Sequence, residues 1–418
     1  MKQVLQLGML SAVNIGISFL FQWYVLTQLG PGIETDALFA GMTLPQLVLV
    51  VISGSLMHVL VPLFSGESEE VLRHDAWGFF FLIGCLFSLI ASILYLLAPW
   101  WVPLTVPGFG KAAQSLTIEM TRIQLVGMVF AAVNGVQWAA YHARQRFIWA
   151  EFTPIIASVS SILLLIWALP RFGVIAAAWI STIRLAIQTC LLLPGMGKLV
   201  RPNLKSPSIK QAWQRIKPLL LGTTYYKTDP LIDRFLLSTA GSGSLSLYYL
   251  AQQIYGAVNQ VLNKAIAAPM VPLLSTLYKT GNMKGFREVY YRRLMQMTIL
   301  SLLGLFVIIF FGQSLLHLLI GHGNVSASNT KELWRIMIWL CGMFFGGAMG
   351  QITSSTFYAC GDTRTPTRMS VCTYTIYIPT KIAIYYLCGI PGLAIVTSIY
   401  LIVNLTLQIY LLKNKGII

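Results

Sequence analysis

Long stretches without a lysine, arginine, aspartate or glutamate recur along this 418-residue chain, among them residues 3–33, 77–110, 235–263 and 294–330. About 20 helical residues cross the hydrocarbon core of a bilayer, so each stretch is long enough to span it. Only 10% of the residues are charged, against about 25% in soluble domains, and the mean hydropathy is +0.72. These features predict a polytopic membrane protein without a soluble domain.

The apolar runs and their polar breaks predict an all-α membrane protein with about twelve transmembrane helices. Tight Gly/Pro turns at residues 169–173 (LPRFG) and 388–392 (CGIPG) predict that the spans on either side of each turn form antiparallel hairpins. The expected spans are 5–29, 37–64, 77–99, 117–141, 150–169, 173–195, 217–239, 246–277, 293–319, 333–359, 369–387 and 391–412.

The net charge of +16 is distributed unevenly between the two sides of these spans. With the N-terminus inside, most lysines and arginines fall in inside loops, and the outside loops hold only Lys111, Arg171, Lys331 and, at a span edge, Arg335. This bias predicts that both termini are cytoplasmic. The excess positive charge is then explained by topology and contact with anionic lipids, and no nucleic-acid partner is expected.

Two pairs of similar segments indicate an internal repeat. VPLFS at 61–65 resembles VPLLS at 271–275, 210 residues later, and the segment around Tyr141 resembles the one around Tyr358, 217 residues later. An offset near half the chain predicts two homologous six-helix lobes in parallel orientation around a central cavity. The expected parts are an N-terminal lobe at 1–197, a basic cytoplasmic linker at 198–217 and a C-terminal lobe at 218–418.

Motifs for familiar catalytic chemistry are absent from the sequence. It has no Walker motif, GxSxG or HExxH, its six cysteines form no CxxC pair, and its histidines are isolated. We therefore expect no enzyme, catalytic residue, metal or cofactor. The alternative from another class is a membrane glycosyltransferase or polymerase in which Glu34 and Asp36 are catalytic.

The segment YYKTDPLIDRFLL places four charges inside the seventh expected span. Each costs a few kcal/mol at bilayer depth, so the four need either partners or a function. On one helix, Lys227 and Arg234 lie about 20° apart, and Asp229 and Asp233 lie about 40° apart on the other face. This predicts a cationic stripe and an anionic stripe on a helix that Pro230 kinks.

Four further cations fall at membrane depth, at Arg122, Arg184, Lys264 and Lys381. Cations fixed in a cavity can bind a diphosphate. Structural alternatives remain: snorkelling or local pairing for the charges of the seventh span, a surface pair with Glu119 for Arg122, and an interlobe contact for Arg184. The glycines of GMFFGGAMG (342–350) favour close helix packing, with a hinge or a substrate-facing surface as the alternatives.

Several motifs in order along nearly the whole chain resemble the MurJ (MviN) lipid II flippases of the multidrug/oligosaccharidyl-lipid/polysaccharide exporter superfamily. The motifs are TDALFAGMTLPQLV from Thr35, VPLFS from Val61, GSGSLSLYYLAQQI from Gly241, VPLLSTLYKTGN from Val271 and FYACGDTRTPTRM from Phe357. The resemblance implies that a polyprenyl-diphosphate-linked saccharide moves from the inner to the outer leaflet by alternating access, with cavity cations binding its diphosphate. Charge matching the family pattern remains at Asp36, Arg122, Asp233 and Arg234.

Departures from the family pattern bear on the cargo. The family arginines of the first, second and eighth spans are replaced by neutral residues at Ile15, Phe21, Leu49, Val50 and Gln253. The sequence also stops after the twelfth span, whereas peptidoglycan flippases have two more helices. We therefore expect an undecaprenyl-diphosphate-linked precursor of capsule, exopolysaccharide or O-antigen rather than lipid II, which is the nearest alternative.

The other alternative within the superfamily is a cation-coupled multidrug exporter in which Asp229 and Asp233 bind the coupling ion. A monomer in the bacterial cytoplasmic membrane is expected, with the lipid-linked saccharide and membrane lipids as partners. The diphosphate-binding candidates are Lys227, Arg234, Lys264, Lys381, Arg184 and Arg122. The candidates for coupling or charge pairing are Asp229, Asp233 and Asp36.

Overall fold

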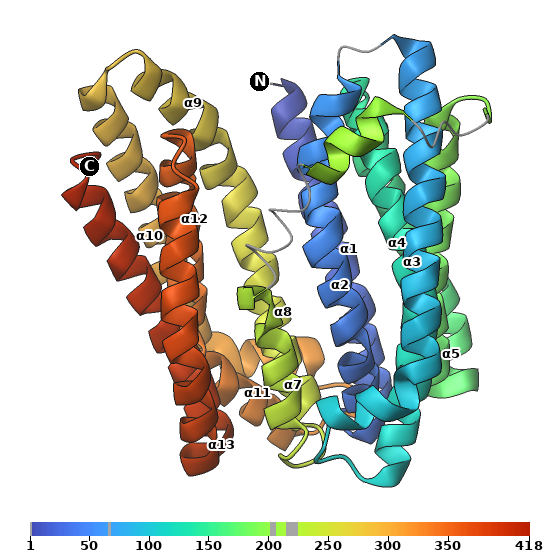
Figure 1. The fold of residues 1–418 in the computed structure, drawn as a ribbon. Helices are drawn as coiled ribbons and strands as arrows, with labels where there is room; N and C mark the ends of the chain where they lie inside the picture. The colour runs from blue at the N-terminus through green and yellow to red at the C-terminus, as the bar shows by residue number, and fades with distance from the viewer. Residues whose placement is uncertain (1, 66–67, 201–205, 215–224) are drawn as a thin grey trace. The chain divides into compact units, whose positions relative to one another are not determined.

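Helices make up the regular secondary structure of the computed structural model, which describes residues 2–65, 68–200, 206–214 and 225–418 (Figure 1). The chain forms two units, Met1–Leu245 and Ser246–Ile418. The first unit contains α1 (Lys2–Leu29), α2 (Ile33–Phe64), α3 (Glu69–Thr105), α4 (Lys111–Ala143), α5 (Phe147–Leu192), the 3₁₀ turns η1 (Leu193–Met196) and η2 (Tyr225–Thr228), and α7 (Asp229–Leu237). The second is built from α8 (Ser244–Leu262), the π-helical turn η3 (Asn263–Ala267), α9 (Ala268–Lys279), α10 (Met283–Ile320), α11 (Ala327–Trp339), α12 (Cys341–Ala359) and α13 (Arg364–Asn414).

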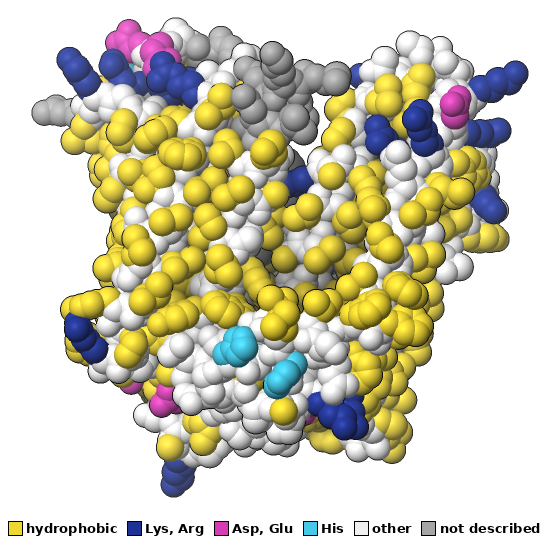
Figure 2. Space-filling model, turned by 180° about the vertical axis from the view of Figure 1, so that it is seen from behind, with side chains coloured by type: hydrophobic (Ala, Val, Ile, Leu, Met, Phe, Trp, Pro, Cys, Tyr) yellow, Lys and Arg dark blue, Asp and Glu magenta, His cyan; other side chains and the backbone are white. Residues whose placement is uncertain are grey.

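Seven of the described helical segments are long and apolar enough to cross a membrane, or eight if α11 and α12, which meet at 47°, form one broken span. Hydrophobic side chains cover much of the face of each unit shown in Figure 2, and lysines and arginines gather toward the ends of the helices. The prediction of an all-α membrane protein is therefore confirmed.

Two of the long helices fold back on themselves. The hydroxyls of Tyr377 and Thr397, both in α13, lie 2.9 Å apart, whereas 20 residues of straight helix would separate them by about 30 Å. In α5 the indole Nε1 of Trp149 donates to the carbonyl oxygen of Leu191, 42 residues away, at 3.1 Å. Both hairpins predicted from the Gly/Pro turns are thus confirmed, and Figure 1 shows α13 reversing direction.

Glycine is required at the reversal of each hairpin. Gly173 in α5 has φ 60° and ψ −150°, and Gly389 in α13 has φ 63° and ψ −146°. Residues with a Cβ are strongly disfavoured in this region. The two glycines are 216 residues apart and have nearly the same backbone conformation, so the two hairpins turn in the same way.

The same offset of 216 residues relates the helices that precede the hairpins. The helix α4 spans Lys111–Ala143, and α11 with α12 spans Ala327–Ala359. A left-handed residue follows two positions after each helix end, Gln145 with φ 57° and Gly361 with φ 77°. The repeat inferred from the sequence is therefore present in the conformation of the two units.

One detail of the predicted repeat is corrected. The amide of Arg146 donates to the carbonyl of Tyr141 at 3.0 Å, and the amide of Asp362 donates to the carbonyl of Phe357 at the same distance. Tyr141 therefore corresponds to Phe357, and its alignment with Tyr358 was wrong by one residue. The feature that the two units share is the hydrogen-bonded end of the helix. This backbone geometry does not depend on which aromatic residue is present, so matching tyrosine with tyrosine gave the wrong alignment.

Parts of the predicted linker at 198–217 and of the seventh span at 217–239 lie outside the described residues, namely 201–205 and 215–224. Residues 207–214 form a helix whose Ala212 is buried in the apolar core of the first unit. The predicted lobe boundaries stay a prediction.

An ion pair closes the loop between α12 and α13, outside the spans. The Lys415 ammonium binds the Asp362 carboxylate and donates to the Thr365 hydroxyl at 2.7 Å. Thr365 also donates to Asp362 through its amide at 3.0 Å and its hydroxyl at 2.6 Å. Burial raises the pKa of Asp362, but the hydrogen bonds from Lys415 and Thr365 outweigh it and hold the pKa at about 2.

Candidate functional site

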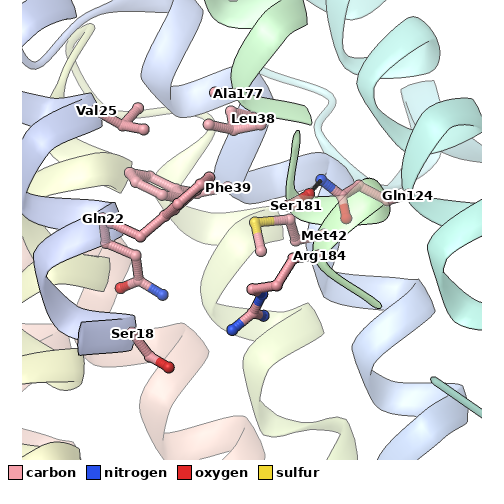
Figure 3. Close-up of a pocket in the computed structure, with 11 residues that line it drawn as sticks. Ser18, Gln22, Val25, Leu38, Phe39, Met42, Gln124, Ala177, Ser181 and Arg184 are labelled. Atoms are coloured by element: carbon pink, nitrogen blue, oxygen red, sulfur yellow. Dashed lines mark hydrogen bonds between the residues drawn. The ribbon is translucent and has the colours of Figure 1, made fainter. Parts of the chain in front are cut away.

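A small cavity lined by both apolar and polar side chains lies among α1, α2, α4 and α5 of the first unit, and Arg184 is one of its lining residues (Figure 3). The side chains of Arg184 and Gln22 extend into it from α5 and α1. The lining residues are Ser18, Phe21, Gln22, Val25, Leu38, Phe39, Met42, Gln124, Ala177, Ser181 and Arg184. Of the six cations predicted from the sequence, Arg184 is the one that lines this cavity.

Hydrogen bonds between α4 and α5 hold the polar wall of this cavity in place. The Gln124 amide donates to the Ser181 hydroxyl at 2.8 Å, and Ser181 donates to the carbonyl of Ala178 at 2.7 Å. The cavity has a volume of about 50 Å³. One water occupies roughly 10–15 Å³ on this scale, so the described conformation has room for a few waters but not for a diphosphate.

Lys264 is exposed in the middle of the candidate span Ser244–Lys279. It lies on the π-helical turn η3, where the amide of Ala268 donates to the carbonyl of Asn263. Pro269 follows directly and has no amide hydrogen to continue the α-helical ladder, which accounts for the irregular turn. A lysine exposed to hydrocarbon at this depth would cost about 2.5–3.5 kcal/mol, so this face of the helix needs water or a polar ligand.

Two glutamines share the face of α8 that leads to Lys264. Gln253, Gln260 and Lys264 fall within about 40° of one another around an α-helix. The resemblance described from the sequence implies an arginine at the position of Gln253, which is neutral here. In this chain the cation therefore lies eleven residues, or about 16 Å, further along the same face.

Lys381 is fully buried in α13, at 0% exposure. Its ammonium lies 4.9 Å from the ring centroid of Tyr377, which stacks on Tyr400 at 4.1 Å. The Tyr377 hydroxyl is hydrogen-bonded to Thr397. This geometry favours a role for Lys381 in packing the α13 hairpin through a cation–π contact.

Arg122 binds a carbonyl that a proline leaves without its usual donor. Its Nε donates at 3.3 Å to the carbonyl oxygen of Tyr95, and its guanidinium lies 4.7 Å from the Tyr95 ring centroid. In a regular helix the amide of residue 99 would donate to this oxygen, but residue 99 is Pro99. The Glu119 pair considered from the sequence is thus not the contact that the structure describes for Arg122.

The charged residues of α7 pack within the first unit. Asp233 and Arg234 are both buried, and Arg234 Nε donates to the Thr43 hydroxyl of α2 at 3.3 Å. Asp36, also buried, accepts a 2.7 Å hydrogen bond from the amide of Gly243 in the loop after α7. These contacts attach the last turn of α7 and the loop after it to α2, which is a structural role.

The predicted cationic stripe of Lys227 and Arg234 on a continuous seventh helix is wrong, whereas Asp229 and Asp233 both lie in α7. Lys227 belongs to the 3₁₀ turn Tyr225–Thr228, and α7 begins only at Asp229. Pro230 lies in the first turn of α7, where its missing amide hydrogen costs nothing, so it starts the helix instead of kinking it. Lys227 and Asp229 are half-buried. The angle of 100° per residue applies within an α-helix, so it does not relate Lys227 in the 3₁₀ turn to Arg234 in α7.

The structure thus divides the sequence-predicted cations by accessibility. Arg184 lines a cavity, Lys264 is exposed and Lys227 is half-buried, whereas Arg234 and Lys381 are buried and Arg122 binds α3. Sequence reasoning missed the cavity residues Ser18, Gln22, Gln124 and Ser181. The only signal was their polarity within apolar spans, which many other residues of this chain share.

The repeated helical units, the paired hairpins and the intramembrane cations define a class of two-lobe membrane transporter. A protein-family model described as "Lipid II flippase MurJ" matches residues 25–418. The chain belongs to the MurJ family. This membership confirms the predicted family, the transporter class and the two-lobe fold that MurJ shares with MATE transporters, and it excludes an enzyme.

Similar proteins are distant in sequence. A "Probable lipid II flippase MurJ" of Buchnera aphidicola subsp. Acyrthosiphon pisum is 21% identical over 388 residues, which cover 89% of this chain and 76% of that protein. One of the same description from Vibrio cholerae is 23% identical over 323 residues, covering 74% of this chain and 60% of that protein.

Solved structures show the same fold. The structure described as "Lipid II flippase MurJ, inward closed conformation" superposes with a TM-score of 0.83 at 16% identity and covers 97% of this chain and 87% of its own. An inward-facing MATE family multidrug resistance transporter superposes with a TM-score of 0.75 at 16% identity, covering 98% and 94%.

Proposed function

We propose that this protein is a flippase that carries an undecaprenyl-diphosphate-linked saccharide from the inner to the outer leaflet of the bacterial cytoplasmic membrane. Its two lobes would alternate access to a central cavity, and both termini would be cytoplasmic. The observation that carries the proposal is the exposed ammonium of Lys264 in the middle of a membrane span of a MurJ-family chain.

Lys264 and Arg184 are the cations that we assign to the diphosphate. Charge-assisted hydrogen bonds to phosphate oxygens are the strong kind, and each contributes about 1.5–3 kcal/mol. The half-buried Lys227 is a third candidate. The cavity beside Arg184 is too small for a diphosphate in this conformation, so binding there requires α1, α2 or α5 to move.

Lipid II is the cargo that the comparisons favour, because the relatives are described as probable lipid II flippases. They give less support to the capsule, exopolysaccharide or O-antigen precursor preferred from the sequence. One observation still favours that second candidate. Gln253 is neutral, and the cation on the same helix face is Lys264. The diphosphate would therefore bind at a different depth in the membrane than it would beside an arginine at position 253.

A multidrug exporter is the weaker functional alternative. MATE transporters share the fold, but at 15–17% identity the likeness concerns the fold alone. An organic cation would need an acidic cavity, and the cavity of the first unit is lined by an arginine. Asp229 and Asp233 remain the candidates for a coupling site in that reading.

The cargo is tested by depleting the protein in its native host and measuring the lipid-linked saccharides of the inner leaflet. Accumulation of lipid II would support the first candidate, and accumulation of another undecaprenyl-diphosphate saccharide would support the second. If no lipid-linked saccharide accumulated, the flippase proposal would fail.

A further inference from the structure

The second unit contains a broken membrane helix that its repeat counterpart lacks. The helix α11 ends at Trp339, α12 begins at Cys341, and the two axes differ by 47°. The corresponding helix of the first unit, α4, continues through residue 124, the equivalent of Leu340. Because the two helices share one repeat, the break needs a cause specific to the second unit.

The hydroxyl of Ser398 provides that cause. In a continuous helix the amide of Met343 would donate to the carbonyl of Trp339. Here Met343 donates to the Ser398 hydroxyl at 3.2 Å, and that hydroxyl donates to the Trp339 carbonyl at 2.6 Å. A side chain inserted into the helical hydrogen-bond ladder is a known origin of sharp kinks.

The repeat offers an internal comparison for this insertion. Thr182, the residue equivalent to Ser398, donates to the carbonyl of Ile123 at 3.1 Å, which is the equivalent of Trp339. The helix α4 nevertheless stays continuous there. A hydroxyl that only donates to a backbone carbonyl of the neighbouring helix is therefore compatible with a continuous helix. Ser398 differs from Thr182 because its hydroxyl also accepts a hydrogen bond from the amide of Met343.

Tyr255 of α8 holds both sides of the break. Its hydroxyl donates to the carbonyl of Met337 in α11 at 2.8 Å, and its ring stacks on Phe344 of α12 with centroids 4.9 Å apart. Tyr255 and Phe344 are both buried. The Tyr255 side chain thus contacts α11 before Leu340 and α12 after it, and both contacts stabilise the bent conformation.

Glycines let α12 pack closely against α13, whereas α11 packs against α10, where the Trp334 Nε1 donates to the Ile308 carbonyl at 2.9 Å. A Cβ on Gly342 would lie 2.7 Å from the Ser398 Cβ, and one on Gly346 would lie 2.8 Å from the Leu401 carbonyl carbon. These glycines therefore let α12 contact the second arm of α13 directly. This supports close packing for the glycine-rich segment predicted from the sequence. The break at Leu340 lies two residues before that segment begins.

We propose that Leu340 is a hinge about which α11 swings during transport, with Ser398 and Tyr255 as the positioning residues that set the bent state. Its role in moving cargo rests on the flippase function proposed above. The effect of Ser398 on the helix geometry does not depend on that function. Without the Ser398 hydroxyl, the amide of Met343 can donate to the carbonyl of Trp339, and the helix straightens.

The test uses spin labels at the exposed positions 331 of α11 and 358 of α12, introduced by Lys331→Cys and Tyr358→Cys after replacement of the six native cysteines. Straightening a 47° bend at residue 340 lengthens the 331–358 distance by about 3 Å. We expect Ser398→Ala to produce this shift and to slow flipping in proteoliposomes at least tenfold. Thr182→Ala, the repeat-equivalent control, should change neither quantity.

Tyr255→Phe, which keeps the ring and removes the hydroxyl, is the second variant in case Ser398→Ala does not fold. It should broaden the distance distribution toward the longer value and slow flipping. An unchanged distance in whichever variant folds would overturn the hinge. If the wild-type protein moved no lipid-linked saccharide, the proposed function would fail. The change in the 331–358 distance would still test the hinge, because it does not depend on transport.

Discussion

Arg122 and Pro99 should be energetically coupled, because the guanidinium replaces the donor that the proline lacks. Arg122 Nε lies 3.3 Å from the Tyr95 oxygen and its charge lies over the Tyr95 ring. A hydrogen bond from a charged donor contributes about 1.5–3 kcal/mol. In a Pro99→Ala background the new amide of residue 99 can bind the same oxygen, so most of this contribution is lost.

The double-mutant cycle measures this difference directly. We expect Arg122→Leu to cost about 1–2 kcal/mol more of unfolding free energy in the Pro99 protein than in Pro99→Ala. The cation–π contact and the cost of a membrane-embedded cation occur in both backgrounds and cancel in the cycle. Denaturant titration in detergent micelles, followed by tryptophan fluorescence, provides the four free energies.

Arg171 supplies the matched control. It also places its guanidinium over an aromatic ring, 4.5 Å from the centroid of Trp167, but in the α5 hairpin. The cycle of Arg171→Leu with Pro99→Ala should show no coupling beyond about 0.3–0.5 kcal/mol. A coupling of that small size between Arg122 and Pro99 would refute the explanation given for Arg122.

Three further predictions concern the backbone and the loop ion pair. Gly173→Ala and Gly389→Ala should each cost about 1–3 kcal/mol in the same titration, because both glycines have φ near +60°; equal stability would show that the hairpins can turn otherwise. Gln145→Gly should stabilise by about 0.5–1 kcal/mol by relieving a left-handed glutamine, and a loss of stability would contradict this. The pKa of Asp362 is depressed to about 2 in the folded protein, below its unfolded value near 3.9. The contribution of the Asp362 carboxylate to the free energy of unfolding is therefore complete above about pH 4 and is lost as the pH falls toward 2. The free energy of unfolding of Asp362→Asn should depend less on pH in this window.

The helices and hairpins were predictable because they follow from local properties. Apolar runs of about 20 residues give the spans, and Gly173 and Gly389 have conformations that only glycine adopts readily. The repeat was found from short motifs, but its offset was wrong near Tyr141, because a hydrogen-bonded helix end conserves backbone geometry more closely than aromatic identity.

The roles of the intramembrane charges could not be read from the chain in the same way. The sequence places Arg122, Lys264 and Lys381 alike at depth in apolar spans. Only the fold brings Arg122 to the carbonyl freed by Pro99 and Lys381 to the Tyr377 ring, while Lys264 stays exposed. The contacts of Arg122 join different helices, and those of Lys381 lie inside a hairpin, so spacing along one helix does not predict them.

The break at Leu340 also escaped prediction, although a hinge near the glycine-rich segment was one of the alternatives. Its cause is the Ser398 hydroxyl, which lies about 60 residues further along the chain. A serine in a membrane helix usually bonds within its own helix, and Thr182 shows that even a contact with the neighbouring helix need not break it.

The flipping rate of purified protein in proteoliposomes tests the central claim most directly. A fluorescent undecaprenyl-diphosphate saccharide is supplied in the inner leaflet, and its arrival in the outer leaflet is measured by quenching. We expect transport by the wild type, a loss of roughly 10- to 100-fold in Lys264→Gln and Arg184→Gln, and near wild-type rates in Lys264→Arg and in Lys279→Gln, an exposed lysine at the end of α9. Wild-type rates in both neutral variants would contradict the assignment of these cations to the diphosphate, and no transport by the wild type would contradict the flippase itself.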